Sequence, residues 1–148
     1  MSASFLTYPA VVLDTSVLIK WFRQEEVLAE RALVLRDTYL EGLVIISIPW
    51  LAVYELANVL RYKSDLTTVQ VQEAVQSLLE MELEWVSPSS EAMRRTIEIA
   101  RGYEITFYDA TFVVLAETLK MAFITADERL ARRLALPFVH FLGELDSE

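Results

Sequence analysis

Apolar and polar positions form two kinds of segment along this chain: short apolar runs, and longer stretches with apolar residues three or four positions apart. The first kind is typical of buried strands and the second of amphipathic helices. The short runs predict strands over 10–13, 43–48, 84–87, 121–125 and 138–142. The longer stretches predict a helix that starts near residue 15 and further helices over 25–40, 49–63, 67–80, 89–101, 108–119 and 127–135.

The predicted strands alternate with helices from one end of the chain to the other. Parallel strands need crossover connections, and helices are the usual crossovers. We therefore expect an α/β fold, a three-layer α/β/α sandwich with a mostly parallel central sheet. A length of 148 residues suits one compact domain over 1–148, with terminal tails at residues 1–8 and 144–148.

Composition excludes several classes of protein. No apolar run approaches the roughly 18 residues that a membrane-spanning helix needs, and the N-terminus lacks the pattern of a secretory signal. The absence of cysteine excludes disulfides, thiolate metal ligands and cysteine nucleophiles. We expect a cytoplasmic protein with no membrane segment.

The net charge of −9, from 22 acidic and 13 basic residues, is unexpected for a domain that would bind nucleic acid by charge alone. The acids can be spread over a solvated surface. Alternatively, several of them converge on a site where cations restore the balance. The positions of particular acids along the chain bear on this choice.

Asp14 and Asp127 both follow predicted strands. Ligands of open parallel sheets bind beyond the carboxyl ends of the strands, so these two carboxylates are expected at one edge. Structural roles compete with this interpretation. Asp14 could cap the following helix, while Thr125 and Glu128 fit a capping box that leaves Asp127 itself without a required role.

Glu55 is surrounded by apolar residues in the helix predicted over 49–63, where an ionised group needs compensation. Asn58, three positions later on the same helical face, suggests a polar pocket in an otherwise buried surface. Asp109 has a structural alternative, because it fits a capping box that begins at Thr106. If these acids converge with the other two, repulsion raises their pKa values and favours bound cations.

The available ligand types narrow the choice of metal. There is no cysteine, and the one histidine, His140, lies in an apolar strand-like run where a structural role is expected. Carboxylate oxygens are hard ligands that suit Mg²⁺ or Mn²⁺ and disfavour zinc. Convergence of the acids would therefore imply a magnesium or manganese site.

Four segments carry a resemblance to a known family: VLDTS at 12–16 with KWF at 20–22, YELANVL at 54–60, YDAT at 108–111, and ITAD at 124–127. Each is common alone, but their order and context are specific in combination. The sequence resembles the PIN-domain nucleases, and among them the VapC-type toxins of prokaryotic toxin–antitoxin pairs. The resemblance covers nearly the whole chain.

This resemblance implies a ribonuclease that cleaves single-stranded RNA with Mg²⁺ or Mn²⁺. It assigns the metal-binding and catalytic positions to four acids: Asp14, Glu55, Asp109 and Asp127. Thr15, Ser16 and Thr125 are similar to the supporting hydroxyls of the family, beside the polar Asn58 noted above. The resemblance also implies a cognate antitoxin protein as a partner, and a homodimer.

Three arginines on the helix predicted over 127–135, Arg129, Arg132 and Arg133, are candidate phosphate contacts for RNA. An ordinary solvated helix face, with Glu128 paired nearby, explains them equally well.

Two other functions compete with the nuclease. A PIN-like scaffold for protein interactions without nuclease activity would be expected to lose some of the four acids, which are all present here. A metal-dependent phosphatase of a small phosphoester would require a nucleophilic Asp-x-Asp. That motif is missing here, because Ser16 stands two residues after Asp14.

Overall fold

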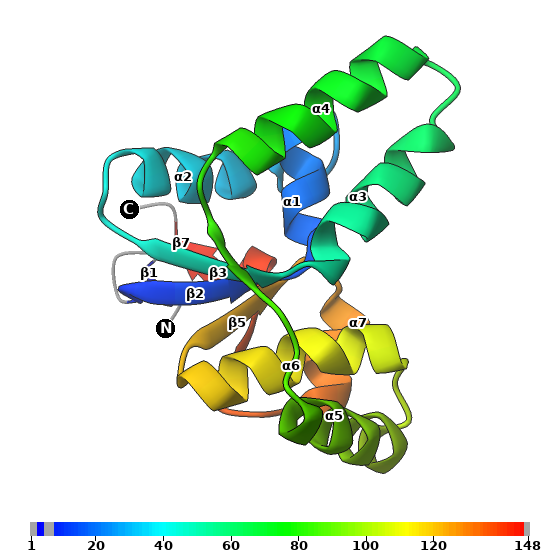
Figure 1. Cartoon of the computed structure of the whole chain (residues 1–148). Helices are drawn as coiled ribbons and strands as arrows, with labels where there is room; N and C mark the ends of the chain where they lie inside the picture. Colours follow the sequence, from blue (N-terminus) through cyan, green and yellow to red (C-terminus); the bar gives the residue numbers. More distant parts are fainter. Residues whose placement is uncertain (1–2, 5–7, 147–148) are drawn as a thin grey trace.

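A five-stranded parallel sheet forms the middle layer of the molecule in the computed structural model, which describes residues 3–4 and 8–146 (Figure 1). The strands are β2 (Ala10–Leu13), β3 (Ile45–Pro49), β4 (Glu84–Val86), β5 (Ala122–Thr125) and β6 (Val139–Phe141). Their spatial order is β4-β3-β2-β5-β6, and every neighbouring pair is parallel. The predicted parallel sheet is therefore confirmed.

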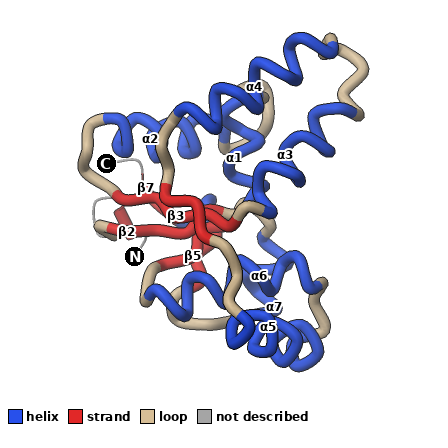
Figure 2. Tube along the Cα trace, in the orientation of Figure 1, coloured by secondary structure: helices blue, strands red, loops and turns tan. Residues whose placement is uncertain are grey.

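Helices cover both faces of this sheet (Figures 1 and 2). The helices are α1 (Thr15–Phe22), α2 (Ala29–Leu40), α3 (Leu51–Arg61), α4 (Thr68–Glu80), α5 (Ser90–Tyr103), α6 (Phe107–Leu119) and α7 (Glu128–Leu134). The first four lie on one side, with α3 and α4 forming a projecting pair, and the last three lie on the other. This is the expected α/β/α sandwich.

The core extends over both faces of the sheet. Phe123 and Ile124 are neighbours in β5 and both are fully buried, although successive side chains of a strand point to opposite faces. Phe112 of α6 packs on Phe123, with 6.1 Å between the ring centroids. Ile46 and Ile48 of β3 are equally buried. Among the described helices, none is both long and apolar enough to cross a membrane.

Several predicted boundaries differ from the structure, and two of the differences have a clear physical cause. Pro49 was expected in the first turn of a helix, but it ends β3, in register with Val86 of β4. The fixed φ of proline suits a strand end as well as a helix start. The helix expected from residue 25 begins only at Ala29, because turns precede it and Leu28 has a left-handed φ of 68° that an α-helix cannot contain.

The expectation of terminal tails at residues 1–8 and 144–148 does not hold throughout. β1 (Ala3–Ser4) and β7 (Leu145–Asp146) pair as a separate two-stranded parallel sheet. A short 3-10 helix, η2 (Leu142–Glu144), leads into β7. Backbone pairing between the two ends therefore replaces free tails at these positions, and the rest of the expected tails at 1–2, 5–7 and 147–148 lies outside the described residues.

The strand order places a topological switch point at the carboxyl end of β2. Strand β3 lies on one side of β2 and β5 on the other, so the connections leave in opposite directions. Open α/β sheets bind ligands at such points. Asp14 follows β2 directly, Asp127 lies two residues beyond the end of β5, and α3 with Glu55 begins just after β3.

Candidate acidic active site

Asp14 is held in place by two hydroxyl groups. Its side chain is only 6% exposed, and Oδ2 accepts hydrogen bonds from Ser16 Oγ at 2.7 Å and Thr125 Oγ1 at 2.8 Å. Both hydroxyls also accept from the backbone: Ala126 N donates to Ser16 Oγ at 2.9 Å and Asp127 N to Thr125 Oγ1 at 3.0 Å. The network ties the end of β2 to the turn between β5 and α7.

This arrangement corrects the view of Asp14 as a helix cap. The residue occupies the N-cap position of α1, but its side chain makes no capping hydrogen bond. Oδ2 is engaged by the two hydroxyls, while Oδ1 makes no hydrogen bond with any described residue and is not sealed from solvent. One oxygen of Asp14 is therefore available for a ligand.

Glu55 is positioned by the neighbouring helix α1. Thr15 Oγ1 donates to Glu55 Oε1 at 2.7 Å, which joins the first turn of α1 to the middle of α3. Asn58 is not part of this arrangement: its side chain is exposed and accepts from Arg61 Nε at 3.3 Å. The expectation of a shared polar pocket is wrong, because the angular offset between positions i and i+3 carries Asn58 from the buried edge of α3 into solvent.

Asp109 and Asp127 lie at helix starts. The N–H of Asp109 donates to Thr106 Oγ1 at 3.0 Å, so Thr106 caps α6 as the sequence predicts. Asp127 is exposed and is itself the cap of α7, accepting from Leu130 N at 3.1 Å. The capping box expected to begin at Thr125 is therefore wrong, since the Thr125 hydroxyl is occupied by the Asp14 network.

The four carboxyl groups share one electrostatic neighbourhood. Burial raises the pKa of Asp14 from its usual 3.8 to about 6, and the charges of Asp109 and Glu55 add to the rise while the two hydroxyl hydrogen bonds oppose it. Burial and the charge of Asp109 raise the pKa of Glu55. Burial and the charge of Asp127 raise the pKa of Asp109. The charges of Glu55, Asp109 and Asp127 thus each make ionisation of another acid less favourable.

These acids suit a hard cation by chemical type. Within residues 3–4 and 8–146, none of the four forms an ion pair with lysine or arginine. Uncompensated carboxylates favour a divalent cation with oxygen ligands. However, no three acidic or histidine side chains of the described chain meet closely enough to form a ready metal-binding group. The residues fit a metal by type and charge, not by a preformed cluster.

The arginines of α7 are all exposed, and two of them have partners. Arg132 pairs with Glu128 at 3.5 Å, and Arg133 Nη1 donates to the carbonyl of Glu104 at 2.9 Å. Arg129 has no side-chain partner among the described residues. The pairing expected for an ordinary solvated face is present for Arg132, and Arg129 is the least engaged of the three.

Two exposed tyrosines beside the acids, Tyr54 and Tyr108, were not singled out as site residues from the sequence. The signal that could have found them is an aromatic residue directly before Glu55 and directly before Asp109. Both residues are exposed, and they lie in the first turns of α3 and α6.

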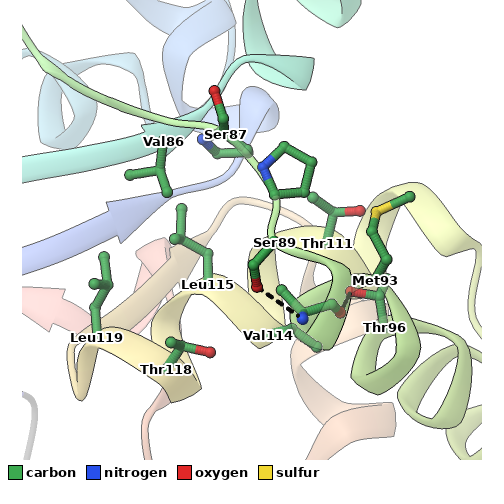
Figure 3. A pocket seen from close by; sticks show the side chains of 13 residues that line it. Val86, Ser87, Ser89, Met93, Thr96, Thr111, Val114, Leu115, Thr118 and Leu119 are labelled. Carbon is green, nitrogen blue, oxygen red and sulfur yellow. Dashed lines mark hydrogen bonds between the residues drawn. The ribbon is translucent and has the colours of Figure 1, made fainter.

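A separate apolar pocket lies between α5 and α6, below the connection from β4 to α5 (Figure 3). It has a volume of about 130 Å³, and Val86, Leu115 and Leu119 are among its lining residues. Two of its hydroxyls, those of Thr96 and Thr111, donate to carbonyls of their own helices. The pocket contains no carboxylate and adds no cation ligand to the acidic site.

Solved structures with the same fold come from archaea and bacteria. A protein of Pyrobaculum aerophilum, PAE2754, is 16% identical, with a TM-score of 0.67 and coverage of 90% of each chain. A chain of a toxin–antitoxin complex from Klebsiella pneumoniae is 19% identical, with a TM-score of 0.65 and coverage of 89% of this chain and 97% of that one. VapC20 of Mycobacterium tuberculosis, a sarcin–ricin loop cleaving toxin, is 13% identical, with a TM-score of 0.66 and coverage of 87% and 96%.

At identities of 13% to 19%, these structures show only that the fold is shared. No curated protein matches the sequence. The family comparison is more specific, because the sequence model of the PIN domain matches residues 11–135, from the second residue of β2 to the residue after α7. This match spans most of the chain and all four acids, and the chain therefore belongs to the PIN domain family.

Proposed function

We propose that this PIN domain is a Mg²⁺- or Mn²⁺-dependent endoribonuclease that cleaves single-stranded RNA, and that it is the toxin of a type II toxin–antitoxin pair. One observation carries the proposal. A buried carboxylate, Asp14, lies at the switch point of the sheet, with one oxygen fixed by two hydroxyls and with other carboxyl groups close enough to raise its pKa. The family assignment supports a nuclease built on this arrangement.

The proposed ligands of the cation are Asp14, Glu55, Asp109 and Asp127. PIN-domain nucleases generally use divalent metals, and a bound cation would neutralise these carboxylates and stabilise the charge that develops on the phosphoryl oxygens. The hydroxyls of Ser16 and Thr125 hold Asp14, and that of Thr15 holds Glu55. These fixed orientations reduce the conformational entropy lost when the site binds substrate.

The proposed RNA substrate and protein partner are supported by the structural neighbours. One is a sarcin–ricin loop cleaving toxin, and another belongs to a toxin–antitoxin complex. We extend these properties to this chain as part of the proposal: RNA as substrate and a cognate antitoxin protein as partner. The proposal also includes a homodimer, which rests on the family resemblance of the sequence.

A scaffold function without nuclease activity is the second candidate. The observation that favours it is that no three acids of the described chain meet in a ready metal-binding group. A scaffold would bind a protein partner and would neither take up Mn²⁺ nor cleave RNA.

Cleavage of labelled RNA tests the nuclease directly. Purified protein is incubated with unstructured and structured RNAs in Mg²⁺ or Mn²⁺, in EDTA, and as the Asp109→Asn variant. The matched control is Asp37→Asn, because Asp37 is an exposed aspartate on α2 that pairs only with its neighbour Arg36. We expect cleavage of unstructured RNA by the wild type and the control, and its loss in EDTA and in Asp109→Asn. Cleavage that persists in Asp109→Asn would show that the acidic site does not catalyse the reaction.

A further inference from the structure

Two aromatic side chains next to the acidic site remain in solvent. Tyr54 is 72% exposed and Tyr108 is 58% exposed, and neither makes a hydrogen bond or a ring contact with any described residue. Trp50, by comparison, is less exposed and has one face stacked on Trp85, with 4.7 Å between the ring centroids. The two tyrosines thus present accessible rings, while Trp50 has a protein partner.

The two rings lie on opposite layers of the sandwich. Tyr54 precedes Glu55 on α3, which covers one face of the sheet, and Tyr108 precedes Asp109 on α6, which covers the other (Figure 1). Helix α3 starts at the carboxyl end of β3, and α6 runs back to the start of the parallel strand β5, so the first turns of both helices lie at the carboxyl edge of the sheet, where Asp14 lies. One tyrosine therefore lies on each side of the acidic site.

Positive charge near the site is scarce. The chain carries −9 net charges, and two of the three arginines of α7 are engaged with Glu128 and with the carbonyl of Glu104. A single-stranded nucleic acid can gain affinity without cations when its bases stack on aromatic rings. Scattered exposed apolar residues are common on protein surfaces. Tyr54 and Tyr108 differ from such residues because each directly precedes a different acid of the site in the sequence.

We propose that Tyr54 and Tyr108 bind single-stranded RNA by stacking on the two bases that flank the cleaved phosphodiester. The inference rests on the proposed nuclease function and names the feature of the substrate that the site recognises: unpaired bases that can turn outward. A base-paired helix keeps its bases stacked on one another and cannot offer these faces. The two rings thereby explain a preference for unpaired RNA in a site with little positive charge.

Binding of a fluorescein-labelled, unstructured RNA of about ten nucleotides, a length within the range of known single-strand sites, tests this inference. Fluorescence anisotropy in EDTA measures Kd without cleavage. Tyr54→Ala and Tyr108→Ala should each weaken binding by about 5- to 100-fold, whereas Tyr54→Phe and Tyr108→Phe should stay within about twofold because the ring is kept. The matched control is Tyr62→Ala, at the far end of α3, where Tyr62 is 68% exposed.

The outcomes separate this inference from the nuclease proposal. Alanine variants that bind RNA as tightly as Tyr62→Ala would overturn the stacking role and leave the two rings to a protein partner, even if the wild type cleaves RNA. Wild-type protein that does not bind the RNA would also overturn it. Affinity that depends on the two rings, in a protein that never cleaves RNA, would support the stacking role and reject the nuclease instead.

Discussion

At the scale of single residues, the hydrogen bond from Thr125 to Asp14 joins two strands inside the core. Thr125→Val keeps the shape of the side chain but removes the donor to Asp14 and the acceptor for the N–H of Asp127. A hydrogen bond to a charged group contributes about 1.5–3 kcal/mol, so we expect a loss of that size in the free energy of unfolding. Urea denaturation measures it, with Thr118→Val, an exposed threonine of α6, as the control. Equal losses of unfolding free energy in Thr125→Val and Thr118→Val would contradict this contribution of the hydrogen bond.

The ionisation of Asp14 predicts a pH dependence of stability. Its pKa is raised from 3.8 to about 6, so between these values the folded protein holds a proton that the unfolded chain has lost. Stability therefore falls as pH rises through this window, and it stays lower above it, by about 3 kcal/mol. The Asp14→Asn side chain cannot ionise, so this variant lacks the pH-dependent contribution of Asp14 to stability. Urea denaturation in EDTA should show the wild type losing stability relative to Asp14→Asn from about pH 4 to about pH 7. Free energies of unfolding that change with pH in the same way in the two proteins would refute the raised pKa of Asp14.

The sequence identifies the acids of the candidate site, and the family resemblance names Thr15, Ser16 and Thr125 as supporting hydroxyls, but neither shows which acid each hydroxyl contacts. Asp14 and Asp109 stand at local positions, after a strand and in a first helical turn, that a single segment reveals. The bond between Thr125 and Asp14 joins residues 111 positions apart, and it depends on β2 and β5 being neighbours. Asn58 was misplaced for a related reason: whether a residue at the edge of a helical face is buried depends on packing against other elements.

At the scale of elements, Asp127 has a structural role in α7 that is separable from the proposed metal binding. Asp127→Ala removes both the cap and the charge, and should cost about 1 kcal/mol of stability, whereas Asp127→Asn keeps an oxygen that accepts from Leu130 N and should cost less. Urea denaturation compares the two, with Ser89→Ala, the loss of the α5 cap, as the reference. Equal stability of Asp127→Ala and wild type would show that the cap contributes nothing.

The existence and type of the elements follow from periodicity, whereas their ends depend on tertiary structure. The helices over 68–80 and 107–119 match the predictions to within a residue, because their apolar spacing is regular and Thr67 and Thr106 cap them. The start of α2 was missed because turns occupy the residues before it and Leu28 adopts a left-handed φ of 68°. The apolar spacing of the segment does not reveal these turns.

At the scale of the whole molecule, alternation of strands and helices predicts the fold class, but not the strand order β4-β3-β2-β5-β6. That order depends on which faces pack together, and it places the switch point beside Asp14. Similarly, the net charge of −9 fits both acids spread over a solvated surface and acids gathered at a cation site, and it does not show which acids would converge. Position beyond the strand ends points to Asp14 and Asp127.

The charge of the molecule also predicts how the proposed RNA binding responds to salt. With few free arginines, few phosphates are neutralised, and the affinity should fall only weakly as salt rises. Arg129→Ala should weaken binding across RNA sequences and reduce the slope of log K against log salt by about 0.7. Anisotropy titrations at several salt concentrations measure the slope, with Arg94→Ala, an exposed arginine of α5, as the control. An unchanged slope in Arg129→Ala would remove Arg129 from the RNA-binding surface.

The central claim is that Asp14 and its neighbouring acids hold a divalent cation, and a titration with Mn²⁺ followed by electron paramagnetic resonance tests it most directly. The account predicts saturable binding to the wild type and to the Asp37→Asn control, and a large loss of affinity in Asp14→Asn. Wild-type protein that binds no Mn²⁺, or an Asp14→Asn variant that binds it as tightly as the wild type, would contradict the account.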